Sequence, residues 1–154
     1  MDENAAALIE TIRTAFKDVA LEDGIGLFEA QGLDDYKTSE ECRELRQQDA
    51  KNSWEEISVA DLNTCYSSLS FFDAKGMRFH LPAFLLADIK GKYNFDMALT
   101  LTHLSDYSRS QFSALSFDQR QAVRAYLFYI RDTELYALDR PQIERALQEY
   151  WTDE

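Results

Sequence analysis

The fold is decided by the stretch from Phe71 to Phe84, which reads FFDAKGMRFHLPAF. Its first nine residues form two short apolar runs around an Asp-Ala-Lys-Gly sequence, and Asp followed closely by Gly is typical of a tight turn. Because alternate residues of a strand point to opposite faces, the pattern places Phe72 and Phe79 in the core and turns Arg78 and His80 outward. The stretch therefore predicts a short β-hairpin over its first nine residues.

Helices are predicted on both sides of this hairpin. Pro82 suits the first turn of a helix because it has no N–H group, and apolar residues continue from it to Ile89. Two of the three glycines in 22–36 can end a helix, so an irregular connection is expected there. Apolar spacing of three or four, with capping residues, predicts further helices over 4–20, 38–53, 58–69, 116–131 and 139–151. Residues 93–104 are ambiguous between helix and strand, with helix favoured. The predicted fold class is mostly α (α+β): a compact helical domain with one short central β-hairpin.

The composition is that of a single packed domain. The chain has 154 residues, 45% of them apolar, and only two prolines and five glycines interrupt them, so residues 1–154 are predicted to fold around one core. No stretch approaches the ~20 consecutive apolar residues of a membrane span, and the first residues are acidic where a secretory signal is basic. We therefore expect a cytoplasmic protein without a membrane partner, in which Cys42 and Cys65 stay reduced.

The charge is strongly negative and unevenly distributed. The net charge is −12, and residues 1–61 hold 16 acidic and 6 basic side chains, so −10 of it lies in the first two-fifths of the chain. Such a field repels nucleic acid and anionic membranes and speeds the encounter with a basic partner. An acidic surface also keeps a protein in solution, and this second interpretation stays open.

Motifs for cofactor chemistry are absent from the sequence. Gly24 and Gly26 do not begin a dinucleotide-binding motif, because no strand is predicted before them and the position of the third glycine holds Glu29, whose charge repels phosphate. The two histidines, His80 and His103, lack the spacing of a zinc site. No cofactor is therefore predicted.

Several polar residues have both a chemical and a structural interpretation. Carboxylate oxygens suit magnesium or calcium, so Glu29, Asp34, Asp35 and Asp73 could share a cation if folding brought them together. Acidic loop residues more often cap helices and close turns. His80 is either a neutral base or ligand, or a histidine whose ring is hydrogen-bonded to a neighbouring carbonyl or carboxylate.

Two segments carry a family resemblance. The first is DGIGLFEA at 23–30 followed by LDDY at 33–36, and the second is FFDAKGMRFHLPAF at 71–84. Together they resemble an uncharacterised family of small bacterial proteins, a domain of unknown function. The resemblance spans most of 23–89 and the helix at 116–130. It implies a bacterial cytosolic origin and brings no activity or catalytic residue with it.

The favoured hypothesis is an acidic protein-interaction domain, such as an immunity-type or antitoxin-like inhibitor of a basic partner protein. It depends on the charge of the first 61 residues and on the lack of a catalytic signature. Aromatic side chains anchor many interfaces, and Tyr36, Trp54 and Trp151 are candidates for that role, although a core position suits each of them equally well. The acidic candidates are Glu29, Asp34, Asp35, Glu40, Glu41 and Glu44.

The alternative is a small enzyme or metal-dependent domain centred on Asp73, Arg78 and His80. A base, a carboxylate that orients it and an arginine that binds an anion would suffice for acid–base chemistry in a shared pocket, with Glu29 and Asp34 nearby. The two hypotheses are separated by geometry, because only the second requires these side chains to converge on a cavity.

Overall fold

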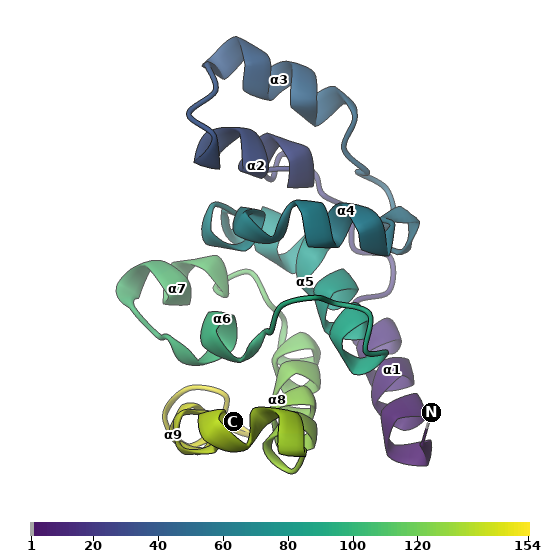
Figure 1. The fold of residues 1–154 in the computed structure, drawn as a ribbon, viewed down its shortest axis with the longest axis vertical. Coiled ribbons are helices and arrows are strands. Elements are labelled where there is room, and N and C mark those ends of the chain that lie inside the picture. The colour runs from purple at the N-terminus through teal and green to yellow at the C-terminus, as the bar shows by residue number, and fades with distance from the viewer. Residues whose placement is uncertain (1) are drawn as a thin grey trace.

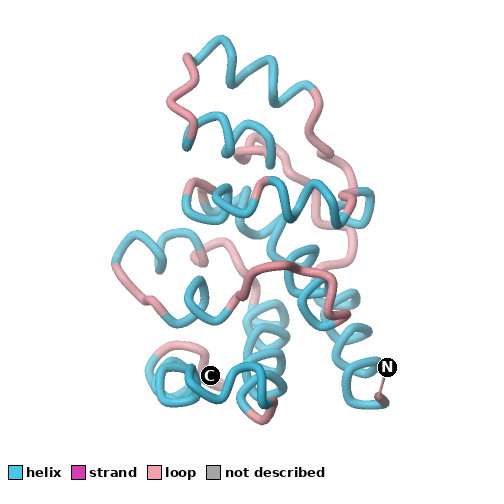
Figure 2. Tube along the Cα trace, viewed as in Figure 1, coloured by secondary structure: helices cyan, strands magenta, loops and turns pink. Residues whose placement is uncertain are grey.

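The computed structural model describes residues 2–154, and all secondary structure in that range is helical (Figures 1 and 2). The longer helices are α1 (Glu3–Ala15), α2 (Leu27–Asp34), α3 (Ser39–Gln47), α5 (Ala74–Ile89), α8 (Phe117–Arg131) and α9 (Arg140–Glu149). The shorter ones are η1 (Trp54–Glu56), α4 (Val59–Thr64), η2 (Tyr66–Ser70), α6 (Ala98–Thr102), α7 (Asp106–Gln111) and η3 (Glu134–Asp139). Because no strand occurs between residues 2 and 154, the predicted β-hairpin is wrong.

Helix α5 takes the place of the hairpin. The Asp-Ala-Lys-Gly sequence does not turn the chain back; it starts the helix, since Asp73 is the N-cap and its side chain accepts a hydrogen bond from Gly76 N. Eleven of the sixteen residues of α5 are buried, on every face of the helix. A helix buried all round has no polar face, so its sequence lacks the periodicity that identifies an amphipathic helix and its apolar runs resemble strands.

Pro82 lies in the middle of α5 and not at its first turn, which corrects the second prediction for this stretch. A proline inside a helix removes one main-chain hydrogen bond, a loss of ~3 kcal/mol or more. Its neighbours Leu81, Phe84 and Leu85 have no exposed surface, and burial of such side chains contributes ~1.5–3 kcal/mol each. Packing of the surrounding helix therefore outweighs the local cost of the proline.

The other helices are arranged around α5 (Figure 1). Helices α1, α4, α7 and η1 pack directly against it, and α8 packs against α1. Helix α9 lies at one end of the long axis and contacts α6 and α8. Helix α2 packs on η2, and α3 packs on α2 to form a helical hairpin at the opposite end (Figure 1).

A half-buried carboxylate anchors the C-terminal end of α5. Asp88 accepts hydrogen bonds from the hydroxyl groups of Tyr126 in α8 and of Tyr136 in η3, the latter at 2.8 Å. Both tyrosines are buried, and burial raises the pKa of Asp88 although the two hydroxyl donors oppose the rise. The contact fixes α5 to two elements that lie some forty residues or more away in the sequence.

Three of the helix starts predicted from capping residues are confirmed, whereas the side chain of Asp139 makes no capping hydrogen bond at the start of α9. Thr38 Oγ1 accepts from Glu41 N while Glu41 accepts from Thr38 N, which is the capping box expected at the start of α3. Ser58 caps α4 and Ser116 opens α8 with a capping box. Helix α3 is anchored as weakly as predicted, since Cys42 is its one buried residue.

Helix ends and connections were predicted less well. Helix α1 ends at Ala15, earlier than expected, and the connection predicted for 22–36 contains α2. The predicted helix over 58–69 divides at Cys65 into α4 and η2. Asp18 and Glu22, between α1 and α2, adopt positive φ angles of 63° and 57°, a conformation that few residues other than glycine favour. Tertiary contacts of this connection, described below, hold it in place.

The structure also bears on two earlier expectations, the lack of a membrane span and the state of the two cysteines. Between residues 2 and 154 no helix combines the length and the hydrophobicity that crossing a membrane requires. Cys42 and Cys65 are both free thiols and both buried. Burial raises the pKa of each thiol, that of Cys65 to about 11, so neither is a reactive thiolate near neutral pH.

The burial of α5 predicts unequal effects of two identical substitutions. Phe79→Ala should lower the free energy of unfolding by ~3–5 kcal/mol, because Phe79 has no exposed surface and its removal leaves a cavity. The control Phe117→Ala truncates a side chain that is 56% exposed at the start of α8 and should change stability by less than ~1 kcal/mol. Urea denaturation followed by circular dichroism measures both, and equal losses would contradict a core position for Phe79.

Candidate functional site

The two segments that carry the family resemblance meet at the N-terminus of α5. Asp73 Oδ1 accepts one hydrogen bond from Gly76 N in α5 and a second from Ile25 N in the connection before α2, both at 2.9 Å. A methyl group on Gly24 would lie 2.7 Å from Gly76 N, and one on Gly76 would lie 2.6 Å from the Ile25 carbonyl oxygen. The absence of side chains at these glycines therefore lets the two backbones touch while one carboxylate joins them.

Ion pairs surround this junction on its solvent side. Glu22 pairs with Lys75 at 3.3 Å and with Arg78 at 2.8 Å, and Asp23 pairs with Lys75 at 2.8 Å. The Lys75 ammonium lowers the pKa of Asp23 through a hydrogen bond and its charge. Because the Glu22, Asp23 and Lys75 side chains are exposed, the pairs orient the connection and add little stability. Arg78 therefore binds a carboxylate of its own chain.

Buried and half-buried carboxylates also fix the start of α2. Asp49 accepts hydrogen bonds from Phe28 N at 2.6 Å and Glu29 N at 3.2 Å, and burial raises the pKa of this carboxyl group against the effect of the two donors. Glu29 accepts from Gly26 N at 2.9 Å and faces the Arg46 guanidinium at 3.4 Å. Glu29, one of the predicted surface acids, thus caps the helix that contains it.

Arg46 connects α3 to the same junction. Its guanidinium donates to the carbonyl oxygen of Gly24 at 2.5 Å and to that of Glu22 at 2.8 Å, as well as facing Glu29. One arginine near the end of α3 therefore holds the α2–α3 hairpin against the connection that α5 also contacts. The orientation of the hairpin follows from this contact.

His80 lies in the core, which corrects its predicted position on an outward face. It has no exposed surface, its ring is parallel to that of Phe72 with centroids 4.3 Å apart, and it is perpendicular to the ring of Phe79. Nδ1 lies 2.7 Å from the Gly76 carbonyl oxygen, so Nδ1 carries the proton, while Nε2 has no hydrogen-bond partner. Burial lowers the pKa of His80 to about 4, although the hydrogen bond to Gly76 and the charge of Asp73 oppose the change.

The structure does not bring the predicted catalytic group around a shared cavity. Asp73 is exposed and occupied by main-chain N–H groups, Arg78 is paired with Glu22, and His80 is sealed from solvent. Asp34 and Asp35 lie at the far end of α2, where both contact the Gln31 amide. Among residues 2–154 no three side chains of the His, Cys, Asp or Glu type gather closely enough to hold a metal ion.

The remaining acidic candidates lie on the α2–α3 hairpin. Asp35, Glu40 and Glu44 are exposed there, and Glu41 is exposed but caps α3. Tyr36, in the turn between the two helices, is 95% exposed and has a φ of 59°. The Lys37 N–H group donates to the Gly32 carbonyl oxygen, which completes the helix-ending turn around this tyrosine.

The two predicted tryptophan anchors are core residues. Trp54 is 5% exposed and its Nε1 donates to the Phe16 carbonyl oxygen at 3.0 Å. Trp151 has no exposed surface and its Nε1 donates to the Leu101 carbonyl oxygen at 2.9 Å. Of the three aromatic candidates, only Tyr36 is available at the surface.

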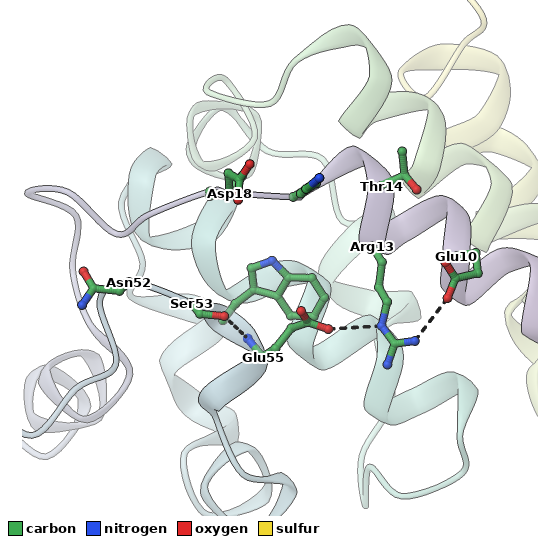
Figure 3. Close-up of a pocket in the computed structure, with 10 residues that line it drawn as sticks. Glu10, Arg13, Thr14, Asp18, Asn52, Ser53 and Glu55 are labelled. Atoms are coloured by element: carbon green, nitrogen blue, oxygen red, sulfur yellow. Dashed lines mark hydrogen bonds and ion pairs between the residues drawn. The ribbon is translucent and has the colours of Figure 1, made fainter.

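A polar groove that the sequence did not predict lies between α1 and residues 52–55 (Figure 3). Its volume is about 410 Å³, and Arg13 stands between Glu10 and Glu55, at 3.3 and 3.1 Å. Helical spacing alone could have placed Glu10 and Arg13 on the polar face of α1. It could not have shown that residues 52–55 pass beside that face, which is a long-range contact.

The junction at Asp73 predicts a graded response to substitution. Asp73→Ala removes the acceptor for both main-chain N–H groups and should lower the free energy of unfolding by about 1–3 kcal/mol. Asp73→Asn keeps one oxygen acceptor and should lose less, while Asp153→Ala, an exposed site after α9, should have almost no effect. Thermal and urea denaturation measure the series, and equal stability of all four proteins would exclude the bridging role.

The buried histidine predicts a pH dependence of stability. Between about pH 6.5 and pH 4 the unfolded chain binds a proton at His80 and the folded chain does not, so stability attributable to this group is complete above pH 6.5 and falls as the pH decreases. At pH 5 the loss should be ~2 kcal/mol relative to pH 7. In His80→Leu that part of the loss should disappear, because all other titrating groups are shared. Parallel pH profiles of the two proteins would contradict a buried neutral ring.

No curated protein and no solved structure matches this chain significantly. The model of a family of unknown function, DUF6714, matches residues 4–154, which confirms the resemblance to an uncharacterised domain family. Because this match spans nearly the whole chain, the protein belongs to the family of unknown function DUF6714.

Proposed function

We propose that this protein is an acidic interaction domain of the bacterial cytoplasm that binds a basic surface of a partner protein through its α2–α3 hairpin. An immunity-type or antitoxin-like inhibitor works in this way, by covering a basic surface of the protein that it neutralises. The contact surface consists of Asp34, Asp35, Tyr36, Glu40 and Glu44, which we call the hairpin surface.

The observation that carries the proposal is the position of Tyr36. A tyrosine that is 95% exposed gains nothing from the core of its own chain, and its positive φ is unfavourable for a residue with a side chain. Tyrosine is among the residues that contribute most to protein interfaces, because its ring offers contact area and a hydroxyl group with little loss of conformational entropy. Leu33, 39% exposed one turn before it, extends the apolar part of the surface.

The negative charge of the hairpin surface supports a partner with a basic surface. Asp35, Glu40 and Glu44 are exposed on the hairpin and none of them forms an ion pair within residues 2–154, whereas Glu29 and Glu41 cap helices of their own chain. Unpaired carboxylates at one end of a protein with a net charge of −12 attract basic surfaces over about a Debye length. The same charges also favour solubility, so the experiment must separate attraction of a partner from a general effect on the protein.

The enzyme hypothesis gains no comparable observation. His80 is sealed in the core, and Asp73 and Arg78 are engaged with other residues of the chain. The proposal therefore places function on the surface of the hairpin.

Site-specific photocrosslinking tests the proposal in the native host. A benzoylphenylalanine in place of Tyr36 should capture a protein with a basic surface, while the same residue in place of Leu138 should not. Leu138 is the matched control because it is 93% exposed in η3, which packs against α9 at the opposite end of the molecule. Capture of the same proteins from both positions would remove the hairpin surface as the contact.

The captured partner should then show an electrostatic dependence. Glu40→Gln combined with Glu44→Gln removes two charges and leaves the capping box of Glu41 intact, so the fold is retained. Association with the partner should slow several-fold at low salt, with a much smaller change in dissociation. Stopped-flow experiments at two salt concentrations measure the association rate. An association rate that responds neither to salt nor to the double substitution would exclude a basic partner surface.

A further inference from the structure

Helices α1 and α8 lie antiparallel against each other. At one end Gln119, in the first turn of α8, donates to the carbonyl oxygen of Ala15 at the end of α1, at 3.2 Å. At the other end Asp2, the N-cap of α1, lines the same hollow as Thr133, just after α8. The pair therefore has a long outer face that runs the length of both helices.

Two hollows extend along this face. One, of about 530 Å³, lies toward the end of α1 and the start of α8, and the other, of about 540 Å³, lies toward the start of α1 and the end of α8. Thr11 lines both, so they meet at the middle of α1. We call the two together the α1–α8 groove. It is separate from the hairpin surface, since none of its lining residues belongs to α2 or α3.

Small side chains line much of the groove, and the larger Leu8, Phe128 and Tyr129 line its half toward the end of α8. Ala7, Thr11 and Thr14 of α1 face Ala122 and Ala125 of α8. Small residues let another helix approach closely, and a helix seated between two others packs at axial distances of 8–10 Å. Helices of 13 and 15 residues provide a groove ~20 Å long at 1.5 Å per residue, which is the length of about four helical turns.

The rims of the groove are acidic. Asp2 and Asp132 line one hollow, Glu10 and Asp118 line the other, and no lysine or arginine lines either. Arg13 and Arg131 reach Glu10 and Asp132 from outside the groove, at 3.3 and 3.2 Å. These pairs are exposed and contribute little, so lysines of a partner can replace them.

We propose that the α1–α8 groove binds an amphipathic helix of a partner protein whose narrow apolar stripe is bordered by lysine or arginine. The small and apolar side chains that line the groove accept the stripe, and the acidic rims pair with the basic borders. A second copy of this chain fits less well, because pairing the same face of two copies brings Asp2, Glu10, Asp118 and Asp132 of each against those of the other.

Synthetic peptides test the proposal on the whole protein. A set of helical peptides of about sixteen residues carries alanine or leucine at positions i, i+3, i+4 and i+7, with lysine on both borders, and a matched set carries glutamate instead. We expect fluorescence anisotropy to detect binding of lysine-bordered peptides that weakens with salt, and no binding of the glutamate set. Failure of every lysine-bordered peptide, or equal binding of both sets, would overturn the proposal.

A pair of threonine substitutions locates the binding site. Thr11→Arg fills the middle of the groove with a large basic side chain and should weaken peptide binding at least tenfold, whereas Thr64→Arg, at the exposed end of α4, should leave it unchanged. Both positions are exposed, and circular dichroism confirms that both variants fold. Unchanged binding by Thr11→Arg would overturn the proposal.

Two further measurements distinguish the α1–α8 groove from the hairpin surface and from a dimer interface. The Glu40→Gln and Glu44→Gln protein should bind the peptide as the unsubstituted protein does, and a tenfold loss there would move the site to the hairpin surface. Sedimentation should show a monomer at the concentrations used, and a dimer that Thr11→Arg dissociates would assign the groove to a second copy of the chain and overturn the proposal.

Discussion

The burial of the central part of α5 on every face is the constraint on which the rest of the structure depends. A helix with apolar residues on every face exposes no polar side to water, so other helices must cover it in all directions. Helices α1, α4, α7 and η1 do this directly, and carboxylates anchor α5 near each end. Asp73 joins its first turn to the connection before α2, and Asp88 joins its last turn to the hydroxyl groups of α8 and η3.

The junction at the start of α5 also determines how the α2–α3 hairpin is oriented at the surface. The backbones of Gly24 and Gly76 touch, and Arg46 holds α3 against the same connection. The α2–α3 hairpin has little core of its own. Its orientation is therefore set by contacts with the connection before α2, which α5 also contacts. The geometry of this junction keeps the α2–α3 hairpin at one end of the molecule (Figure 1).

Acidic residues of this chain fall into two groups with different roles. Asp49, Asp73 and Asp88 accept hydrogen bonds from main-chain or tyrosine donors and hold elements together. Others, such as Glu40 on the hairpin surface and Asp118 at the α1–α8 groove, are exposed and do not hold elements of the fold together. The acidic residues of 1–61 are distributed over α1, the α2–α3 hairpin and the connections beside them, and α1 and the hairpin lie apart (Figure 1).

The sequence by itself determined what depends on residues close together in the chain. The capping signals at Thr38, Ser58 and Ser116 correctly placed three helix starts, since a capping side chain bonds an N–H group only three residues away. Only the tertiary structure decided that residues 74–79 belong to a helix, that His80 and Trp54 are buried, and that the predicted catalytic residues do not share a cavity. Burial on all sides erases the periodicity that distinguishes a helix from a strand, and it is imposed by helices distant in the sequence.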